Sequence, residues 1–326
     1  FLGGLTANYG SNLIMNRAEG ELVVVVEADE YDRSFLTLSP DIAVVTAIEP
    51  DHLDIYDQEN ALEEAFAEFI GKLKGEGVLF FNHRVSEKAL SQLQPQVEVR
   101  SYGIDAGAFR AENWEMIQGR SHFDVIVDDD ANTVTDFTLG MPGYYNSENA
   151  VVAIAVGLSL GLLPRQIQTG ISSYKGVKRR FEYRINEPDC VFVDDYAHHP
   201  TEVRAFLESM KALYPDQRLT VVFQPHLFSR TRDFAKGFAK SLSLADEVVL
   251  MDIYPAREEP IPGITSRLIF DKVDTEQKLL VKAEELLEKI ELLQPEVLAT
   301  LGAGSIDRWV DPIQQLLESK SKKQKI

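Results

Sequence analysis

The spacing of apolar residues divides the first part of the chain into short buried strands and amphipathic helices. Residues 22–26 and 42–48 are continuously apolar and rich in β-branched side chains, which is typical of strands buried on both faces of a parallel sheet. Residues 59–73 carry apolar side chains three and four positions apart, and this spacing predicts a helix with one buried face. The alternation continues with strands at 78–81 and 97–102 and a helix at 85–93. It predicts a parallel, wound α/β sheet.

The pattern changes after residue 109, where a small antiparallel layer is expected. Residues 123–127 and 133–139 alternate around an acidic turn, which predicts a hairpin, and helices follow at about 147–161 and 164–174. A second α/β unit comes next, with strands at 191–193, 219–223, 247–254, 278–281 and 297–301 and helices beginning near 200, 234, 284 and 306. One long helix over 275–293 is the alternative to the strand at 278–281 and the helix from 284. We predict two domains, residues 1–183 and 184–326.

Acidic residues follow both of the first two apolar runs. Glu27 and Asp29 come after the first run, and Glu49, Asp51 and His52 come after the second. Ligands of open α/β sheets bind outside the carboxyl ends of the strands, so we expect both clusters at the edge that carries the chemistry. Carboxylate oxygens with one imidazole suit Mg or Mn better than Zn. The alternative is that these acids cap helices or lie in solvated loops.

Charged residues also follow the strands of the second unit. Asp195 ends one strand and His198 lies in the loop after it, while His226 and Arg230 follow the next strand. Arginine at such a position binds carboxylate or phosphate in a forked geometry, and its alternative is a surface ion pair. Adjacent histidines in a loop are as often solvated as functional.

Two further features have an ordinary structural alternative. The GAGS turn at 302–305 lies between a strand and a helix, where backbone amides can bind an anion, although glycine there also serves tight geometry. Residues 175–180 contain four basic side chains, although the protein as a whole is acidic. Such a cluster could balance the charge of a triphosphate bound at a domain hinge, and the alternative is a solvated linker.

Composition narrows the functional class. The 326 residues carry a net charge of -19, which opposes non-specific binding to nucleic acid or anionic membranes. The single cysteine, Cys190, excludes an intrachain disulfide and suits a reducing compartment. No apolar run approaches the ~20 residues that span a bilayer and no signal peptide is visible, so a cytoplasmic protein is predicted. The features together predict an enzyme acting on phosphates between two α/β units, although no G-x-x-x-x-G-K-[ST] phosphate-binding loop occurs.

Eight segments resemble the Mur ligase family, in order and over nearly the whole chain. The segments are EADEYDRSF (27–35), EPDHLDIY (49–56), PGYYNSENAVVA (142–153), KRRFE (178–182), DDYAHHPTEV (194–203), FQPHLFSRTRDF (223–234), YPAREEPIPG (254–263) and GAGSI (302–306). The resemblance implies a central ATPase-type parallel-sheet domain, incomplete because its P-loop is missing, followed by a Rossmann-like C-terminal α/β domain.

The resemblance also implies roles for individual residues. Glu27 and His52 correspond to Mg²⁺ ligands. Residues implied in catalysis or in nucleotide and substrate binding are Asn146, Asn149, Arg180, Asp195, Tyr196, His198 and Arg230. Three positions depart from the family pattern: Tyr145 replaces His, Ala197 replaces Gly and Leu227 replaces Arg. No lysine between residues 54 and 71 matches the carbamylated lysine of some sister ligases.

The implied activity is an ADP-forming amide ligation. ATP and Mg²⁺ would support the joining of L-alanine to the muramyl carboxylate of UDP-N-acetylmuramate through an acyl phosphate, in peptidoglycan precursor synthesis. A ligase that adds a tripeptide to the same nucleotide sugar is the alternative. The family's UDP-binding domain and P-loop precede the part that matches. We therefore expect residues 1–326 alone to be inactive, with weak nucleotide binding at most.

Overall fold

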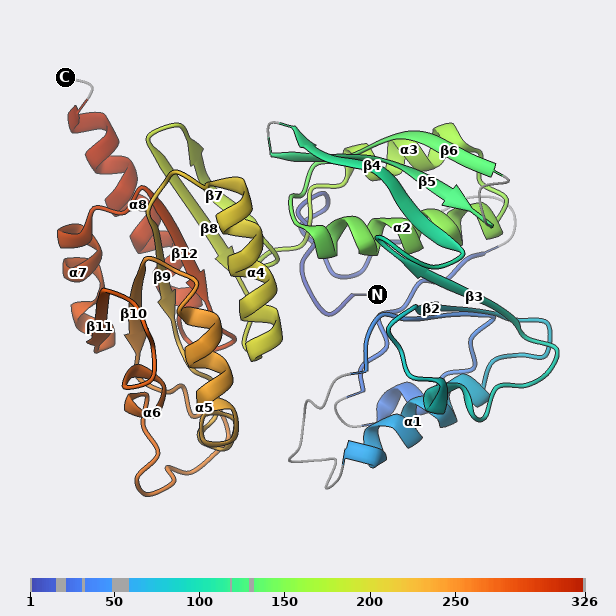
Figure 1. Ribbon diagram of the computed structural model, residues 1–326, viewed down its shortest axis with the longest axis horizontal. Helices are drawn as coiled ribbons and strands as arrows, with labels where there is room; N and C mark the ends of the chain where they lie inside the picture. Colours follow the sequence, from blue (N-terminus) through green and yellow to red (C-terminus); the bar gives the residue numbers. More distant parts are fainter. Residues whose placement is uncertain are drawn as a thin grey trace. The chain divides into compact units, whose positions relative to one another are not determined.

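A computed structural model describes residues 2–15, 22–30, 33–48, 59–117, 119–128 and 132–324, without the side chains of 59–60 and 321–324. The chain forms two compact units, Phe1–Lys175 and Gly176–Ile326, each built on a six-stranded sheet (Figure 1). The predicted division after residue 183 falls inside a strand of the second unit. No helix among the described residues is both long and apolar enough to cross a membrane.

The sheet of the first unit combines parallel strands with an antiparallel layer. Its strands, in spatial order, are β1 (Ile42–Val45), β2 (Val78–Asn82), β3 (Glu98–Gly103), β4 (Phe109–Ile117), β5 (Arg120–Val127) and β6 (Asn132–Leu139). Strands β1 to β4 are parallel, and β4, β5 and β6 pair antiparallel. The predicted parallel sheet and hairpin are therefore confirmed, and β4 extends the hairpin to three strands.

In the described part of the first unit, three α-helices accompany this sheet. They are α1 (Glu59–Gly71), α2 (Tyr144–Ser159) and α3 (Pro164–Ser173). Side chains of α1 pack into a core with Phe35 and the strand residues Val45 and Leu79, which confirms the buried face that its spacing predicted. Short 3-10 turns lie at Ser34–Thr37 and Glu87–Leu90. A helix was predicted at 85–93, but only the short 3-10 turn at Glu87–Leu90 forms there.

The strand predicted at 22–26 is wrong. These residues belong to no strand, and their side chains are between 44% and 79% exposed. A β-branched run has a strong strand preference only when a neighbouring strand supplies hydrogen bonds and packing. In the described part of the chain, β1 is the end strand of the sheet and pairs with β2 alone. Local composition was therefore insufficient to place the run in the sheet.

The second unit is a mainly parallel sheet with helices on both faces. Its strands, in spatial order, are β11 (Gln277–Val281), β10 (Glu247–Met251), β9 (Leu219–Phe223), β12 (Val297–Leu301), β8 (Cys190–Asp195) and β7 (Glu182–Glu187). Only the β7–β8 pair is antiparallel among these. Every residue of β9, β10 and β12 is buried, as expected for strands covered on both faces.

The helices of this unit follow the strands in sequence. They are α4 (Pro200–Leu213), α5 (Phe228–Leu242), α6 (Arg267–Phe270), α7 (Leu286–Leu293) and α8 (Asp307–Gln324), with a 3-10 turn at Ala283–Glu285. Figure 1 shows α4 and α5 on one face of the sheet and α7 and α8 on the other. Val203, Phe206, Leu207 and Met210 form an apolar stripe along α4 that is buried. Helix α5 starts six residues earlier than its predicted range near 234, so it includes Arg230.

Core packing in the first unit gives a direct stability prediction. Leu73 is 1% exposed, whereas Leu163 is 65% exposed. We expect Leu73→Ala to lower the free energy of unfolding by about 2–5 kcal/mol because it leaves a cavity, and Leu163→Ala to change it by about 0.5 kcal/mol or less. The measurement is urea denaturation followed by Trp114 fluorescence in a Trp309→Phe background, which removes the tryptophan of the second unit. Equal effects of the two variants would contradict the described core.

Candidate functional site

The carboxyl ends of the parallel strands in the second unit gather most of the predicted site residues. Asp194 and Asp195 end β8, and both are buried. Asp194 binds Arg179 Nε at 3.0 Å through Oδ2, and its Oδ1 accepts a hydrogen bond from Thr300 Oγ1 at 2.6 Å. Burial raises the pKa of Asp194, and the charge of Arg179 opposes that rise.

Asp195 is held by the backbone on both sides. Its two carboxylate oxygens accept the amides of Phe181 and Ala197, each at 2.7 Å. Burial raises the pKa of Asp195 to about 6, although these two amides lower it. The geometry therefore gives Asp195 a structural task, which is to tie the segment before β7 to the loop after β8.

The basic cluster separates into two kinds of arginine. Arg179 is partly buried and donates from Nη2 to the carbonyl of Gly302 at 2.5 Å, in addition to its ion pair with Asp194. Arg180 is exposed, with its guanidinium carbon 5.7 Å from the centre of the Tyr196 ring. Residue type and spacing do not distinguish these neighbours, although the family resemblance implied a role for Arg180 alone. The structure assigns Arg179 to the framework and leaves Arg180 at the surface beside Tyr196.

His198 is oriented by a residue of α4, the helix that follows it. Its Nδ1 lies 3.1 Å from the carbonyl oxygen of Tyr196 and 3.2 Å from Glu202 Oε2. The same Glu202 oxygen accepts the amides of His198 and His199 and so caps α4. Burial would raise the pKa of Glu202, but its hydrogen bonds and the charge of His198 lower it to about 2. Glu202 was missed from the sequence, although its place three residues after the helix N-cap is a capping signal.

His226 forms the centre of a second group of rings and charges. Its ring lies 6.1 Å from the His198 ring and stacks on Tyr254 at 5.8 Å. Burial, then the nearby charges of His198, Arg230 and Arg257, lower the pKa of His226 to about 4. His226 is therefore a neutral imidazole at physiological pH. Arg230, in the first turn of α5, is 7% exposed.

Leu227 occupies the position where the family pattern has arginine. It is buried and has a φ of 68°, a left-handed conformation that is costly for a branched side chain. Its amide donates to the carbonyl of Tyr254 at 2.9 Å. The side chain at this position packs in the interior and offers no charge to a ligand.

The GAGS turn at 302–305 has no room for side chains at its two glycines, because Gln224 and Tyr254 lie against it. A Cβ on Gly302 would lie 2.7 Å from the carbonyl oxygen of Gln224, and one on Gly304 would lie 2.6 Å from Gln224 Oε1. Gln224 Oε1 also accepts the Ile306 amide at 2.8 Å. The structural alternative therefore accounts for both glycines, and one of the amides that could bind an anion is already used.

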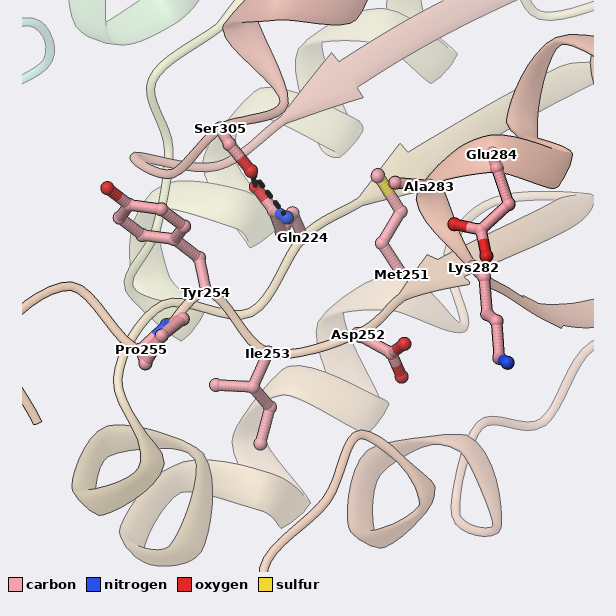
Figure 2. Close-up of a pocket in the computed structure, with 10 residues that line it drawn as sticks. All are labelled: Gln224, Met251, Asp252, Ile253, Tyr254, Pro255, Lys282, Ala283, Glu284 and Ser305. Atoms are coloured by element: carbon pink, nitrogen blue, oxygen red, sulfur yellow. Dashed lines mark hydrogen bonds between the residues drawn. The ribbon is translucent and has the colours of Figure 1, made fainter. Parts of the chain in front are cut away.

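A cavity of about 350 Å³ lies beside this turn. Figure 2 shows Tyr254, Gln224 and Ser305 on one side of it and Lys282 and Glu284 on the other. The lining residues follow β9, β10, β11 and β12, so the cavity is at the strand edge where ligands of such sheets bind. The other lining residues are Met251, Asp252, Ile253, Pro255 and Ala283.

Three predicted ligand-binding residues of the first unit are described. Asn146 donates from Nδ2 to the carbonyl of Pro142 at 2.7 Å, at the start of α2, and Asn149 is exposed on the same helix. Glu27 is exposed, and its Oε2 accepts the Gly3 amide at 2.6 Å. His52, like the rest of the acidic cluster at 49–54, lies outside the described residues. Within the part that is described, no three His, Cys, Asp or Glu side chains lie close enough together to hold a metal ion.

Comparison with known proteins identifies the family. Residues 8–157 match the Mur ligase middle domain, and residues 179–304 match the Mur ligase glutamate ligase domain. The chain belongs to the Mur ligase family. The predicted family, the α/β fold of two sheets and the class of ligase are therefore confirmed.

Individual relatives support this result along the whole chain. A protein of Phocaeicola vulgatus named UDP-N-acetylmuramate–L-alanine ligase is 45% identical over 321 residues, which are 98% of this chain and 69% of that protein. A protein of the same name from Flavobacterium psychrophilum is 43% identical over 98% of this chain and 68% of its own length. The solved UDP-N-acetylmuramate-alanine ligase MurC of Thermotoga maritima has a TM-score of 0.71 at 24% identity, covering 90% of this chain and 63% of that one.

The environment of His226 leads to a pH prediction. Its pKa is lowered in the fold from the usual 6.5 to about 4, so between these values the unfolded chain binds more protons than the folded one. We expect the contribution of His226 to stability to be complete above about pH 6.5 and to decline as the pH falls towards 4. In NMR, the His226 ring resonances should not titrate between pH 5 and 8. A titration midpoint above 6 would contradict the described environment.

Proposed function

We propose that this chain carries the nucleotide-using and amine-accepting parts of an ATP-dependent ligase that joins L-alanine to UDP-N-acetylmuramate. The observation that carries the proposal is the 45% identity over 98% of the chain with a protein named for that reaction. The chain corresponds to about two thirds of such relatives, so the activity is proposed for the full-length gene product. We propose that it acts in the cytoplasm, which suits a chain with a single cysteine.

The reaction has two steps whose charges require stabilisation. A carboxylate oxygen of the muramyl group attacks the γ-phosphorus of ATP, and the bond to ADP breaks to leave an acyl phosphate. The amine of L-alanine then attacks the acyl carbon, phosphate leaves, and the nitrogen loses a proton. Negative charge spreads over oxygens in both steps, so the enzyme mainly needs positioned cations and hydrogen-bond donors.

Residues of the second unit are suited to binding the anionic groups. Arg230 presents a guanidinium from the first turn of α5, where the helix dipole also favours an anion. His198, held by Glu202, lies across from His226. We assign these side chains to the substrate carboxylate or phosphate. Arg180 and Tyr196, with Asp195 fixing their loops, are assigned to the nucleotide.

The first unit is assigned to adenine and the metal. Asn146 and Asn149 stand in the first two turns of α2 and are proposed to contact the base. Glu27 offers an exposed carboxylate of the type that Mg²⁺ prefers, and we propose that Glu27 and His52 hold this ion. When bound, Mg²⁺ neutralises charge on the phosphates.

A substrate panel tests the proposed function. We expect the full-length protein to release phosphate from ATP only when both UDP-N-acetylmuramate and an amino acid are present, with L-alanine as the best amine. Replacing L-alanine by a cell-wall tripeptide covers the alternative, for which a murein peptide ligase of Psychrobacter arcticus offers a structural parallel at a TM-score of 0.58. Efficient use of the tripeptide with no use of L-alanine would overturn the proposal.

Substitution of Glu27 tests the metal assignment. We expect Glu27→Ala in the full-length protein to lower kcat by about 100-fold or more, because one oxygen ligand of the ion is lost, while the thermal unfolding temperature changes little since the side chain is exposed. Asp29→Asn is the matched control, an exposed acid two residues further along, and should retain most activity. Near-normal ligation by Glu27→Ala at low Mg²⁺ concentration would remove the assignment.

A further inference from the structure

The loops after β9 and β10 are joined to each other more closely than their sequence separation suggests. The Leu227 amide donates to the Tyr254 carbonyl at 2.9 Å, and the Tyr254 amide donates to the Pro225 carbonyl at 2.8 Å. His226 and Tyr254 form an isolated parallel bridge, and their rings stack. The loop that carries His226 therefore cannot shift without moving the loop after β10.

Glu258 extends this connection to the start of α5. Its Oε2 accepts the amide of Ser229 at 3.0 Å, and its Oε1 accepts the Ser229 hydroxyl. Ser229 is the second residue of α5, where amides have no partner inside the helix and a carboxylate is favoured by the helix dipole. The carboxylate that satisfies this helix start comes from a loop 29 residues further along the chain.

The helix start needs such external support. The N-cap position of α5 is Leu227, which has no side-chain oxygen to cap with and holds a φ of 68°. Such a conformation persists only when the surrounding contacts enforce it. Those contacts are the Glu258 bonds to Ser229, the Tyr254 carbonyl, and the bonds from the Thr231 amide and hydroxyl to the Leu227 carbonyl.

Arg230 follows Ser229 directly, so the same contacts fix the backbone from which its side chain extends. We propose that Glu258 is a positioning residue for the ligation: by binding both donors of Ser229 it fixes the first turn of α5, and so holds the position from which Arg230 binds a carboxylate group. This inference rests on the proposed function. The carboxylate is that of the amino acid or that of the nucleotide sugar, and the two sources are separated in the experiment below.

The experiment compares steady-state kinetics of variants in the full-length protein. We expect Glu258→Gln to raise the KM for one of the two carboxylate substrates about tenfold, since an amide cannot accept both Ser229 donors with the same strength. The KM for ATP should stay within about twofold. Ser229→Ala should have a smaller effect in the same direction, and Ser229→Thr, which keeps both donors, should behave like the unaltered protein. Titrating L-alanine and UDP-N-acetylmuramate separately identifies the source of the carboxylate.

The matched control is Glu259→Gln, which removes the same charge from the exposed neighbouring residue and should leave every KM unchanged. Hydrogen exchange supplies a measurement that does not depend on turnover. The Ser229 amide should exchange at least about tenfold faster in Glu258→Gln than in Glu259→Gln, because it loses a charged acceptor.

The outcomes distinguish this inference from the proposed function. An unaltered protein that does not ligate L-alanine would overturn the proposed function, and the exchange rates would still report whether Glu258 fixes the helix start. If the protein is active, unchanged KM values in Glu258→Gln would overturn the positioning role. Equal rises in all three KM values, together with a lower unfolding temperature, would assign Glu258 to general stability and overturn it as well.

Discussion

The ion pair between the partly buried Arg179 and the buried Asp194 is the contact on which the second unit's site depends. It joins the segment before β7 to the end of β8, while Thr300 and the Gly302 carbonyl connect the same pair to β12. Removing one partner of such a pair typically costs about 3–5 kcal/mol, because the other charge stays buried. The neighbouring carboxylate of Asp195 adds two backbone amides to this junction. The loops that carry Arg180, Tyr196 and His198 therefore start from a fixed frame.

The two helices that follow, α4 and α5, begin in different ways, and the difference matters for the chemistry. Helix α4 is capped from within by Glu202, whose side chain also holds His198. Helix α5 starts at a leucine in a left-handed conformation and is capped from outside by Glu258. Both arrangements place a carboxylate near a helix N-terminus, and each fixes the backbone beside a residue that we assign to an anionic ligand. In the proposed function, the side chains that cap these helices also position the ligand-binding residues.

Sequence patterns predicted most elements because hydrophobic spacing is a local property. The stripe of α4 and the buried strands β9, β10 and β12 follow directly from it. The same reasoning failed for residues 22–26, since a strand requires a neighbour and composition does not supply one. It also placed the start of α5 too late, because Leu227 gives no capping signal and the cap is provided by Glu258 in another loop.

The sequence by itself determined the family and the α/β class, and it predicted which charged residues follow the strands of the second unit. Only the tertiary structure showed that Arg179 is the ion-pair partner of Asp194 while Arg180 lies at the surface, and that Asp195 is engaged by the backbone. It also revealed that Glu202 and Glu258 cap the helices α4 and α5. The physical reason is distance along the chain: Arg179 meets Gly302 across 123 residues, and Asp194 meets Thr300 across 106. Such pairings arise from the winding of the sheet, which brings strand ends together and which no local pattern encodes.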